Sequence, residues 1–237
     1  MSQTHHRTSR YAIYLCPRVQ TPLFRLGSCW LGRDAFTGES LDPALSNGLS
    51  VKDWSSATES PRRYGFHATL KPPFHLAEGV SYSDLLAAVC AFAKQQACFE
   101  TASLQVDTLG RFFALTLSRP SDELSDFAGA CVSEFDRFRA TPTQQELFRR
   151  LKDSLSERER EHVQRWGYPY VFDTWKFHMS LTGSLPSAEL PRFQKILRER
   201  FAPVCEGPML VDSICIFHEA GRNSPFQLID RCDLRAK

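Results

Sequence analysis

Two short segments of the sequence carry the same order of side-chain types. Residues 66–70 read Phe-His-Ala-Thr-Leu, and residues 177–181 read Phe-His-Met-Ser-Leu. In a β-strand, alternate side chains lie on the same face. If each segment is a strand, it packs an apolar face against the core and presents a histidine and a hydroxyl on the other face. The four polar side chains are His67, Thr69, His178 and Ser180.

A pair of histidines beside hydroxyls suits the hydrolysis of a phosphodiester. One group must take a proton from water and another must give a proton to the departing ribose oxygen, and the ordinary imidazole pKa of about 6.5 allows both roles. A neutral and a protonated histidine share these roles without a metal or another cofactor. We therefore expect His67 and His178 to be the catalytic base and acid, in an order that the sequence leaves open. Thr69 and Ser180 are expected to donate hydrogen bonds to the phosphate oxygens.

The repetition of the motif carries the argument, because a single histidine–hydroxyl pair occurs by chance in many proteins. A lone histidine on a strand is also more often structural than catalytic. Here both copies have the same flanking phenylalanine and leucine, and each lies near the centre of one half of the chain. This arrangement predicts two similar halves that face each other across a pseudo-twofold axis.

Four neighbouring residues are candidates for substrate binding. Lys71 lies two positions after Thr69 and Lys176 two positions before His178, so regular strands would place both on the histidine face as point charges for phosphate. Arg63 and Tyr64 precede the first motif and could bind a phosphate or stack on a base. A solvated position without a functional role explains each of the four residues equally well.

Motifs for metals and nucleoside triphosphates are absent from the sequence. His75 and His218 have no partner at the spacing of metal ligands, and the eight cysteines include no C-x-x-C pair. No metal site is therefore expected. The sequence also contains no G-x-x-x-x-G-K-[ST] and no G-x-G-x-x-G segment, which argues against an NTPase or a dinucleotide-dependent enzyme.

The composition is that of an ordinary globular protein. The 237 residues carry a formal net charge of +2, which excludes the strongly basic character of a nucleic-acid coat. No apolar run approaches the roughly 18 residues of a membrane span, and the polar N-terminus does not resemble a secretory signal. We expect a cytoplasmic protein with reduced cysteines, built as a single domain over 1–237 with a charged helical insertion at about 141–166.

Strand and helix signals are interspersed and include a hairpin, so the expected fold class is α+β. Residues 17–63 are expected to form irregular structure with short helices, and Pro72-Pro73 to end the second strand. Thr141 and Ser156 are expected to begin the helices of the insertion. The expected strands are 11–15, 66–70, 102–109, 112–117, 177–181, 209–217 and 226–229. The other expected helices are 82–96, one that begins near 121, and 187–200.

The paired motifs resemble those of the 2H phosphoesterase superfamily, which includes 2′,5′ RNA ligase-like proteins and cyclic nucleotide phosphodiesterases. Three longer stretches resemble an uncharacterised branch that is encoded in bacterial phosphonate-utilisation operons. The resemblance covers nearly the whole chain. It implies a bilobal α+β fold in which two pseudo-symmetric lobes turn antiparallel sheets toward a central cleft, with helices outside. The three stretches are 10–14, 27–34 and 63–74.

The function expected from residues and resemblance together is metal-independent hydrolysis of a small, cyclic phosphodiester on a ribose or nucleotide, in phosphonate metabolism. The expected partner is a small-molecule substrate rather than a membrane. One alternative is the processing of RNA ends that carry a 2′,3′-cyclic phosphate, which the low net charge and the lack of a basic stripe disfavour. The other alternative is a non-catalytic module that binds or senses a nucleotide, for which two matched acid–base groups would be unnecessary.

Overall fold

The computed structural model describes residues 9–45, 48–151 and 154–236. It is an α+β structure in which the pairings between named strands are antiparallel, and this confirms the expected fold class. Seven strands form one sheet in the order β4-β5-β6-β2-β1-β8-β9, and β3 pairs with β7. The strands are β1 (Arg10–Leu15), β2 (Ala68–Phe74), β3 (Phe99–Thr101), β4 (Leu104–Leu109), β5 (Phe112–Leu117), β6 (Met179–Ser180), β7 (Met209–Val211), β8 (Ser213–Glu219) and β9 (Gln227–Asp233).

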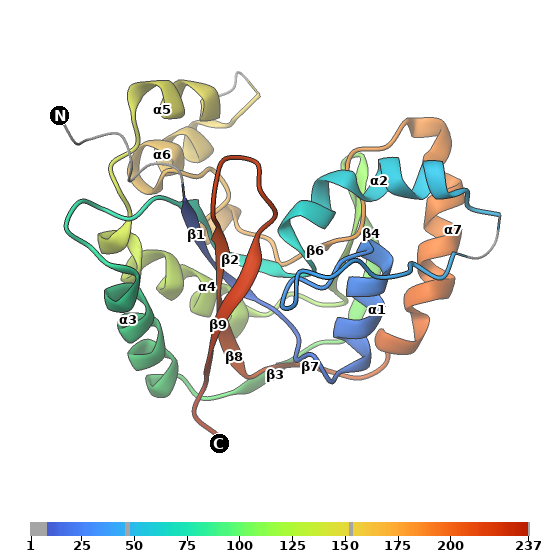
Figure 1. Ribbon diagram of the computed structural model, residues 1–237, viewed down its shortest axis with the longest axis horizontal. Helices are drawn as coiled ribbons and strands as arrows, with labels where there is room; N and C mark the ends of the chain where they lie inside the picture. Colours follow the sequence, from blue (N-terminus) through green and yellow to red (C-terminus); the bar gives the residue numbers. More distant parts are fainter. Residues whose placement is uncertain (1–8, 46–47, 152–153, 237) are drawn as a thin grey trace.

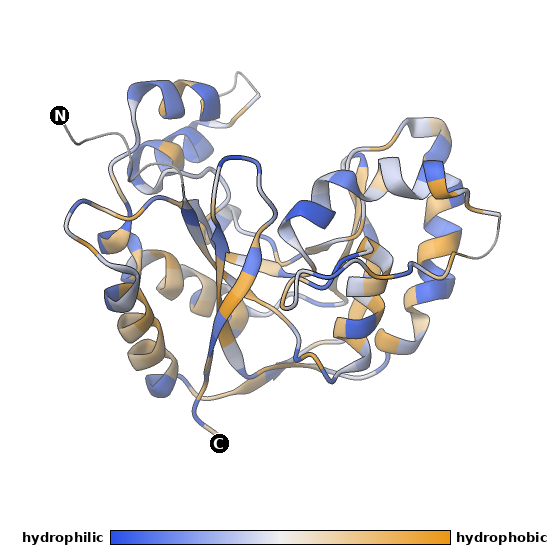
Figure 2. Cartoon of the chain, viewed as in Figure 1, coloured by the Kyte–Doolittle hydropathy of each residue, from blue (hydrophilic) through white to orange (hydrophobic). Residues whose placement is uncertain are grey.

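Helices lie outside the sheet in two groups (Figure 1). The first lobe consists of β2, β1, β8 and β9, covered by α3 and α4, and the second consists of β4, β5 and β6 with α1, α2 and α7. Helices α5 and α6 lie apart at one end and are largely hydrophilic (Figure 2). The helices are α1 (Pro22–Leu31), α2 (Val51–Tyr64), α3 (Tyr82–Gln95), α4 (Asp122–Glu134), α5 (Gln144–Arg150), α6 (Glu157–Trp166) and α7 (Leu190–Phe201), with short 3₁₀ turns at Asp136–Phe138, Phe172–Thr174, Ser187–Glu189 and Ala202–Val204.

The two lobes share one continuous run of strand pairing rather than two separate sheets. The connection is narrow, because β2 and β6 pair through a single residue pair, Ala68 with Met179. Both side chains are 1% exposed. The junction between the lobes is therefore part of the core, and the motif strands lie on either side of it.

Segment 17–63 is more regular than expected. It contains α1 and α2, of 10 and 14 residues. The start of α1 carries sequence signals that the expectation overlooked: the Thr21 side chain accepts a hydrogen bond from the backbone N–H of Phe24, and Pro22 occupies the first turn. Gly32 ends this helix at φ 73°.

Other boundaries also differ from the expectation. Pro72 and Pro73 lie inside β2 rather than at its end. Strand β2 pairs with β6 at Ala68 and with β1 further along, and neither proline is among the residues that pair with β1. The two prolines are therefore tolerated in the strand. Strand β6 covers only two of the five expected residues. The N-cap of helix α5 is Thr143, two residues after the expected Thr141. Thr143 forms a capping box with Glu146.

Two cysteines contradict the expectation that all are reduced. Cys90 of α3 and Cys232 of β9 form a disulfide across a sequence separation of 142 residues. Helix α3 packs directly on β9, which brings the two positions together. Sequence spacing could not predict this pair because the contact depends on tertiary packing. The other six cysteines are free thiols.

Helix α1 approaches the first motif without an intervening side chain at Gly27. A Cβ atom at this position would lie 2.4 Å from the ring of Phe66, which is itself 1% exposed. Phe66 directly precedes His67, so the close approach of α1 fixes the start of the motif segment.

Replacing Gly27 with alanine should lower the free energy of unfolding by about 1–3 kcal/mol, because the ring has no room to move away. In an exposed helix alanine is more stable than glycine by about 1 kcal/mol, but we expect the clash with the Phe66 ring to outweigh this gain. Urea denaturation measures the change. Ser28→Ala is the matched control on the same helix: its hydroxyl is buried without a hydrogen-bond partner in the described structure, so its removal should leave stability equal or higher. A more stable Gly27→Ala protein would contradict the packing argument.

Candidate functional site

The Ala68–Met179 pair sets the register of the two motifs. In an antiparallel ladder the neighbouring positions follow in opposite directions, so His67 lies across from Ser180 and Thr69 lies across from His178. Side chains directly opposite each other have Cβ atoms about 4.5–5.5 Å apart, and diagonal neighbours lie about 7–8 Å apart. All four side chains are partly exposed. Each histidine therefore has one hydroxyl on its own strand and another across from it.

The two imidazoles are held by the same backbone interaction. Nδ1 of His67 lies 2.9 Å from the carbonyl oxygen of Gly65, and Nδ1 of His178 lies 2.9 Å from that of Lys176. A carbonyl oxygen only accepts hydrogen bonds, so Nδ1 carries the proton in both rings and Nε2 is the basic atom of the neutral form. Nε2 of His67 lies 3.3 Å from Oγ1 of Thr69. In both rings the backbone therefore holds Nδ1, and Nε2 of His67 lies beside the hydroxyl of its own motif.

The carbonyl that holds His67 is set by the end of α2. Gly65 caps this helix at φ 79° and ψ 175°, a conformation that strongly favours glycine. A Cβ atom there would also lie 2.5 Å from Cβ of Ala35. The turn at Gly65 directs the chain from α2 into the motif and aims its carbonyl at the imidazole.

His67 occupies an aromatic environment. Its ring stacks on that of Tyr14 at a centroid distance of 3.7 Å and an interplanar angle of 19°, and the Phe217 ring lies 5.9 Å away. Burial lowers the pKa of His67 to about 4; the hydrogen bond to Gly65 opposes the shift and the neighbouring His178 adds to it. His67 is therefore a neutral imidazole at pH 7.

The His178 segment is anchored by two tryptophans. The indole N–H of Trp175 donates to the Thr69 carbonyl at 2.9 Å, and the indole N–H of Trp30 donates to the Leu181 carbonyl at 2.7 Å. The first bond ties the two motif segments directly together. The Phe112 ring meets the His178 ring edge-on, with centroids 5.9 Å apart.

Lys71 does not share the face of Thr69 as regular strand alternation predicts. Thr69 pairs with Tyr14, whereas Lys71 pairs with Ile13, so a register shift at this point places two consecutive residues opposite one. The bulge turns Lys71 into the core, where it is 1% exposed. Its ammonium lies 2.9 Å from Asp136, which α4 and the following turn position beneath β2.

The other three candidate residues take different positions. The Lys176 side chain is exposed, and its backbone carbonyl, rather than its ammonium, contacts His178. Arg63 forms an ion pair with the fully buried Glu219, which holds its guanidinium at that carboxylate. Tyr64 stacks on Phe226 with centroids 5.1 Å apart and lies 6.4 Å from the His67 ring. Tyr64 thus brings its ring close to a motif histidine.

Sequence reasoning did not assign roles to Tyr14 and Trp175. Alternation along β1 could have placed Tyr14 on one face with Arg10, but its pairing with the motif strand depends on which strands are neighbours. Trp175 lies three residues before His178, where nothing in the local pattern indicates a bond to the other motif. The described residues contain no group of three or more histidine, cysteine, aspartate or glutamate side chains arranged to hold a metal ion.

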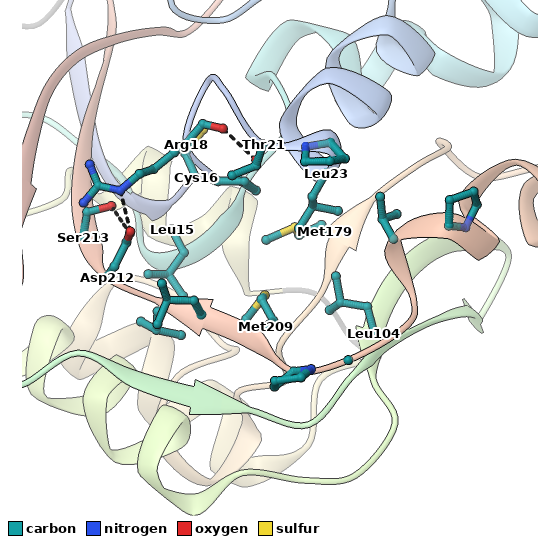
Figure 3. A pocket seen from close by; sticks show the side chains of 18 residues that line it. Leu15, Cys16, Arg18, Thr21, Leu23, Leu104, Met179, Met209, Asp212 and Ser213 are labelled. Carbon is teal, nitrogen blue, oxygen red and sulfur yellow. Dashed lines mark hydrogen bonds and ion pairs between the residues drawn. The ribbon is translucent and has the colours of Figure 1, made fainter. Parts of the chain in front are cut away.

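A separate apolar cavity of about 350 Å³ lies behind the motif strands (Figure 3). Leu15 and Met179 contribute to its wall, and both alternate with residues of the histidine face. An ion pair between Arg18 and Asp212, 2.5 Å apart, closes part of its edge. Neither histidine lines this cavity, so it is distinct from the candidate site. No helix in the described parts of the chain has the length and apolar character that crossing a membrane requires.

The fold and the site together define the class of this protein: it is an α+β protein with two similar histidine segments. The chain belongs to the family described as "Protein of unknown function (DUF1045)", whose model matches residues 69–227. It is 37% identical over 222 residues to the "Ribose 1,5-bisphosphate phosphokinase PhnN" of Janthinobacterium sp. (strain Marseille), and 34% identical over 219 residues to the protein of that name from Laribacter hongkongensis (strain HLHK9). These matches cover 92% of this chain but 49% and 50% of the relatives, so the chain spans about half the length of the curated relatives it matches.

Three of the solved structures with a similar course of the backbone are the following. One is a "phosphoesterase" at 11% identity and a TM-score of 0.43, covering 96% of this chain and 99% of the other. Two are Escherichia coli LigT, complexed with 3′-AMP at 11% identity and with NADP⁺ at 13% identity. Both have a TM-score of 0.41 and cover 96% of this chain, with 99% and 98% of the LigT chains.

The ion pair between Lys71 and Asp136 allows a test of whether the bulge turns Lys71 into the core. Burial lowers the pKa of Lys71 while Asp136 opposes that shift, so Asp136→Ala leaves a buried ammonium without its carboxylate. The free energy of unfolding should fall by about 3–5 kcal/mol. Lys71→Met should change it by about 1 kcal/mol or less, because Asp136 keeps two hydrogen bonds to Arg139, at 2.7 and 3.0 Å. Equal losses in urea denaturation would show that Lys71 is not buried as described.

Proposed function

We propose that this protein is a phosphodiesterase that hydrolyses a small, cyclic phosphodiester on a ribose or nucleotide by two-histidine acid–base catalysis. The observation that carries the proposal is the antiparallel pairing of the two motifs, in which both rings have Nδ1 held by a carbonyl, so that Nε2 is the basic atom of each. A phosphate group between the strands would meet an imidazole and a hydroxyl from each side.

The two histidines receive different roles in this proposal. His67 is neutral because burial lowers its pKa to about 4, so its Nε2 accepts a proton from water as the new P–O bond forms. His178 in its protonated form gives a proton to the ribose oxygen as the other P–O bond breaks. The product leaves with a phosphomonoester and a free hydroxyl, and exchange with solvent restores both protonation states. Thr69 and Ser180 donate hydrogen bonds to the non-bridging oxygens, where negative charge develops.

The substrate class is supported by the relatives and by the motif resemblance. The longer relatives are described as acting on ribose 1,5-bisphosphate, and the resemblance is to proteins encoded in phosphonate-utilisation operons. This chain has no G-x-x-x-x-G-K-[ST] segment. We therefore assign it the hydrolysis of a ribose cyclic phosphate rather than the phosphoryl transfer named for those relatives.

Replacement of either histidine should abolish most of the activity. His67→Ala and His178→Ala are each expected to lower kcat/KM by about 10²–10⁴-fold, because each removes one proton transfer. The assay measures hydrolysis with a chelator present, and circular dichroism checks folding. His218→Ala is the matched control, since His218 stacks on Tyr11 at 4.9 Å, outside the motif pair. Full activity in either motif variant would contradict the assignment.

A panel of possible substrates separates the proposed function from RNA-end processing and from the sensing module. It holds the four 2′,3′-cyclic nucleotides, ribose 5-phosphate 1,2-cyclic phosphate and a short RNA that ends in a cyclic phosphate. Preference for the RNA, with strong salt dependence, would favour RNA-end processing. Binding of one compound without turnover would favour the sensing module.

The pH dependence of kcat/KM tests the role of His67. A general base acts in its unprotonated form, so activity falls as pH drops through its pKa in the free enzyme. With that pKa lowered to about 4, the acid limb should lie near pH 4 rather than near the ordinary value of about 6.5. Tyr14→Ala exposes the stacked ring and should move the limb upward. An acid limb near 6.5 in the unaltered protein would contradict this assignment of the base.

A further inference from the structure

Two tyrosine rings lie beside His67, and a third tyrosine lies near them. Tyr14 stacks on the imidazole, Tyr64 lies 6.4 Å from it, and Tyr168 follows α6. Burial raises the pKa of Tyr14, and the nearby Tyr64 and Tyr168 hydroxyls raise it further. None of these hydroxyls has a hydrogen-bond partner in the part of the chain that the structure describes. Three O–H donors are therefore left for a ligand beside the candidate site.

Guanidinium groups adjoin these hydroxyls. Arg10 lies on the face of β1 that also bears Tyr14, two alternate positions away. It shares the buried carboxylate of Glu219 with Arg63. Two guanidinium groups beside one carboxylate leave a net positive charge. The Arg10 guanidinium lies 5.5 Å from the centre of the Phe226 ring, and Tyr64 stacks on the same ring.

Arg150 lies on α5, which packs at the start of β1, next to Arg10: Glu146 of α5 lies 3.8 Å from Nε2 of His75, and Nδ1 of His75 lies 2.8 Å from the carbonyl oxygen of Ser9. Its guanidinium donates to the carbonyl of Gly167, the residue before Tyr168. It forms no ion pair with any carboxylate in the described residues. Burial lowers the pKa of Arg150; Glu146 opposes this shift, and the nearby Arg10 contributes to it. The insertion thus brings a cation without a paired carboxylate next to another guanidinium.

We propose that Arg10 and Arg150, with the hydroxyls of Tyr14, Tyr64 and Tyr168, bind a second anionic group of the substrate, a phosphomonoester. The inference rests on the proposed function, because the first phosphate is the diester between the two histidines. Guanidinium and hydroxyl donors together match the several acceptor oxygens of a terminal phosphate. The preferred substrate is then a cyclic phosphodiester that carries a further phosphate elsewhere on the same sugar.

The test compares two substrates that differ only in that phosphate: adenosine 2′,3′-cyclic monophosphate and its 5′-phosphorylated form. The unaltered protein should favour the 5′-phosphorylated compound by about 10–100-fold in kcat/KM, the effect of hydrogen bonds to a charged group. Arg150→Gln should reduce this preference by a similar factor. Because the preference is a ratio within one protein sample, partial misfolding does not alter it. Arg149→Gln is the matched control: Arg149 is exposed on the same helix and should leave the preference unchanged.

A second measurement is independent of turnover. Ribose 5-phosphate, titrated by calorimetry, should bind about 10–100-fold more weakly to Arg150→Gln than to the unaltered protein. Thr69→Val should bind it with unchanged affinity, because Thr69 belongs to the diester position.

The outcomes distinguish the two proposals. Equal kcat/KM for both substrates, or a preference that survives Arg150→Gln, would overturn the second phosphate site, while loss of activity in the histidine variants would leave the phosphodiesterase standing. If no compound is hydrolysed, the proposed function fails and the titration alone decides: weaker binding by Arg150→Gln supports the anion site, and unchanged binding overturns it.

Discussion

The antiparallel pair of Ala68 with Met179 is the constraint on which the candidate site depends. A slip of one residue would turn one motif's histidine and hydroxyl to the opposite face, because side chains alternate along a strand. Strand β6 is too short to fix this register alone. Its other edge pairs with β5, where Ser180 lies opposite Ala114, and the Trp175 indole spans from the second motif to the first. The second lobe's hairpin thus holds one half of the site in register with the other.

The symmetry of the site is confined to the backbone. Both imidazoles donate from Nδ1 to a carbonyl two residues earlier, but their surroundings differ. His67 lies against the face of Tyr14, whereas His178 meets the edge of Phe112. A duplicated motif would give two equivalent groups, and acid–base catalysis requires two different ones. The stacked tyrosine breaks the equivalence by burying one ring.

Sequence reasoning reached as far as local periodicity extends. Within the short first motif, the alternation of side chains along a strand places His67 and Thr69 on the same face. At Lys71 the same rule fails because a bulge intervenes, and a bulge is determined by the pairing strand and by the Asp136 partner rather than by the motif. The caps of α1 were readable from the sequence, yet the Cys90–Cys232 disulfide and the Tyr14 stacking were not. Both arise from contacts between segments that the fold brings together.

The two helices of the insertion differ in how they pack, because α6 buries His162 and Val163. Helix α5 has no buried residue, and its capping box and polar surface suffice to form a short helix without help from packing. Polar groups connect this helix to its surroundings: Arg150 donates to the Gly167 carbonyl, and Glu146 lies 3.8 Å from Nε2 of His75. A segment that buries so little apolar surface adds little to the stability of the fold. What α5 does add is charge: in the proposed second phosphate site Arg150 of this helix contributes to binding, while the two lobes position the reacting groups.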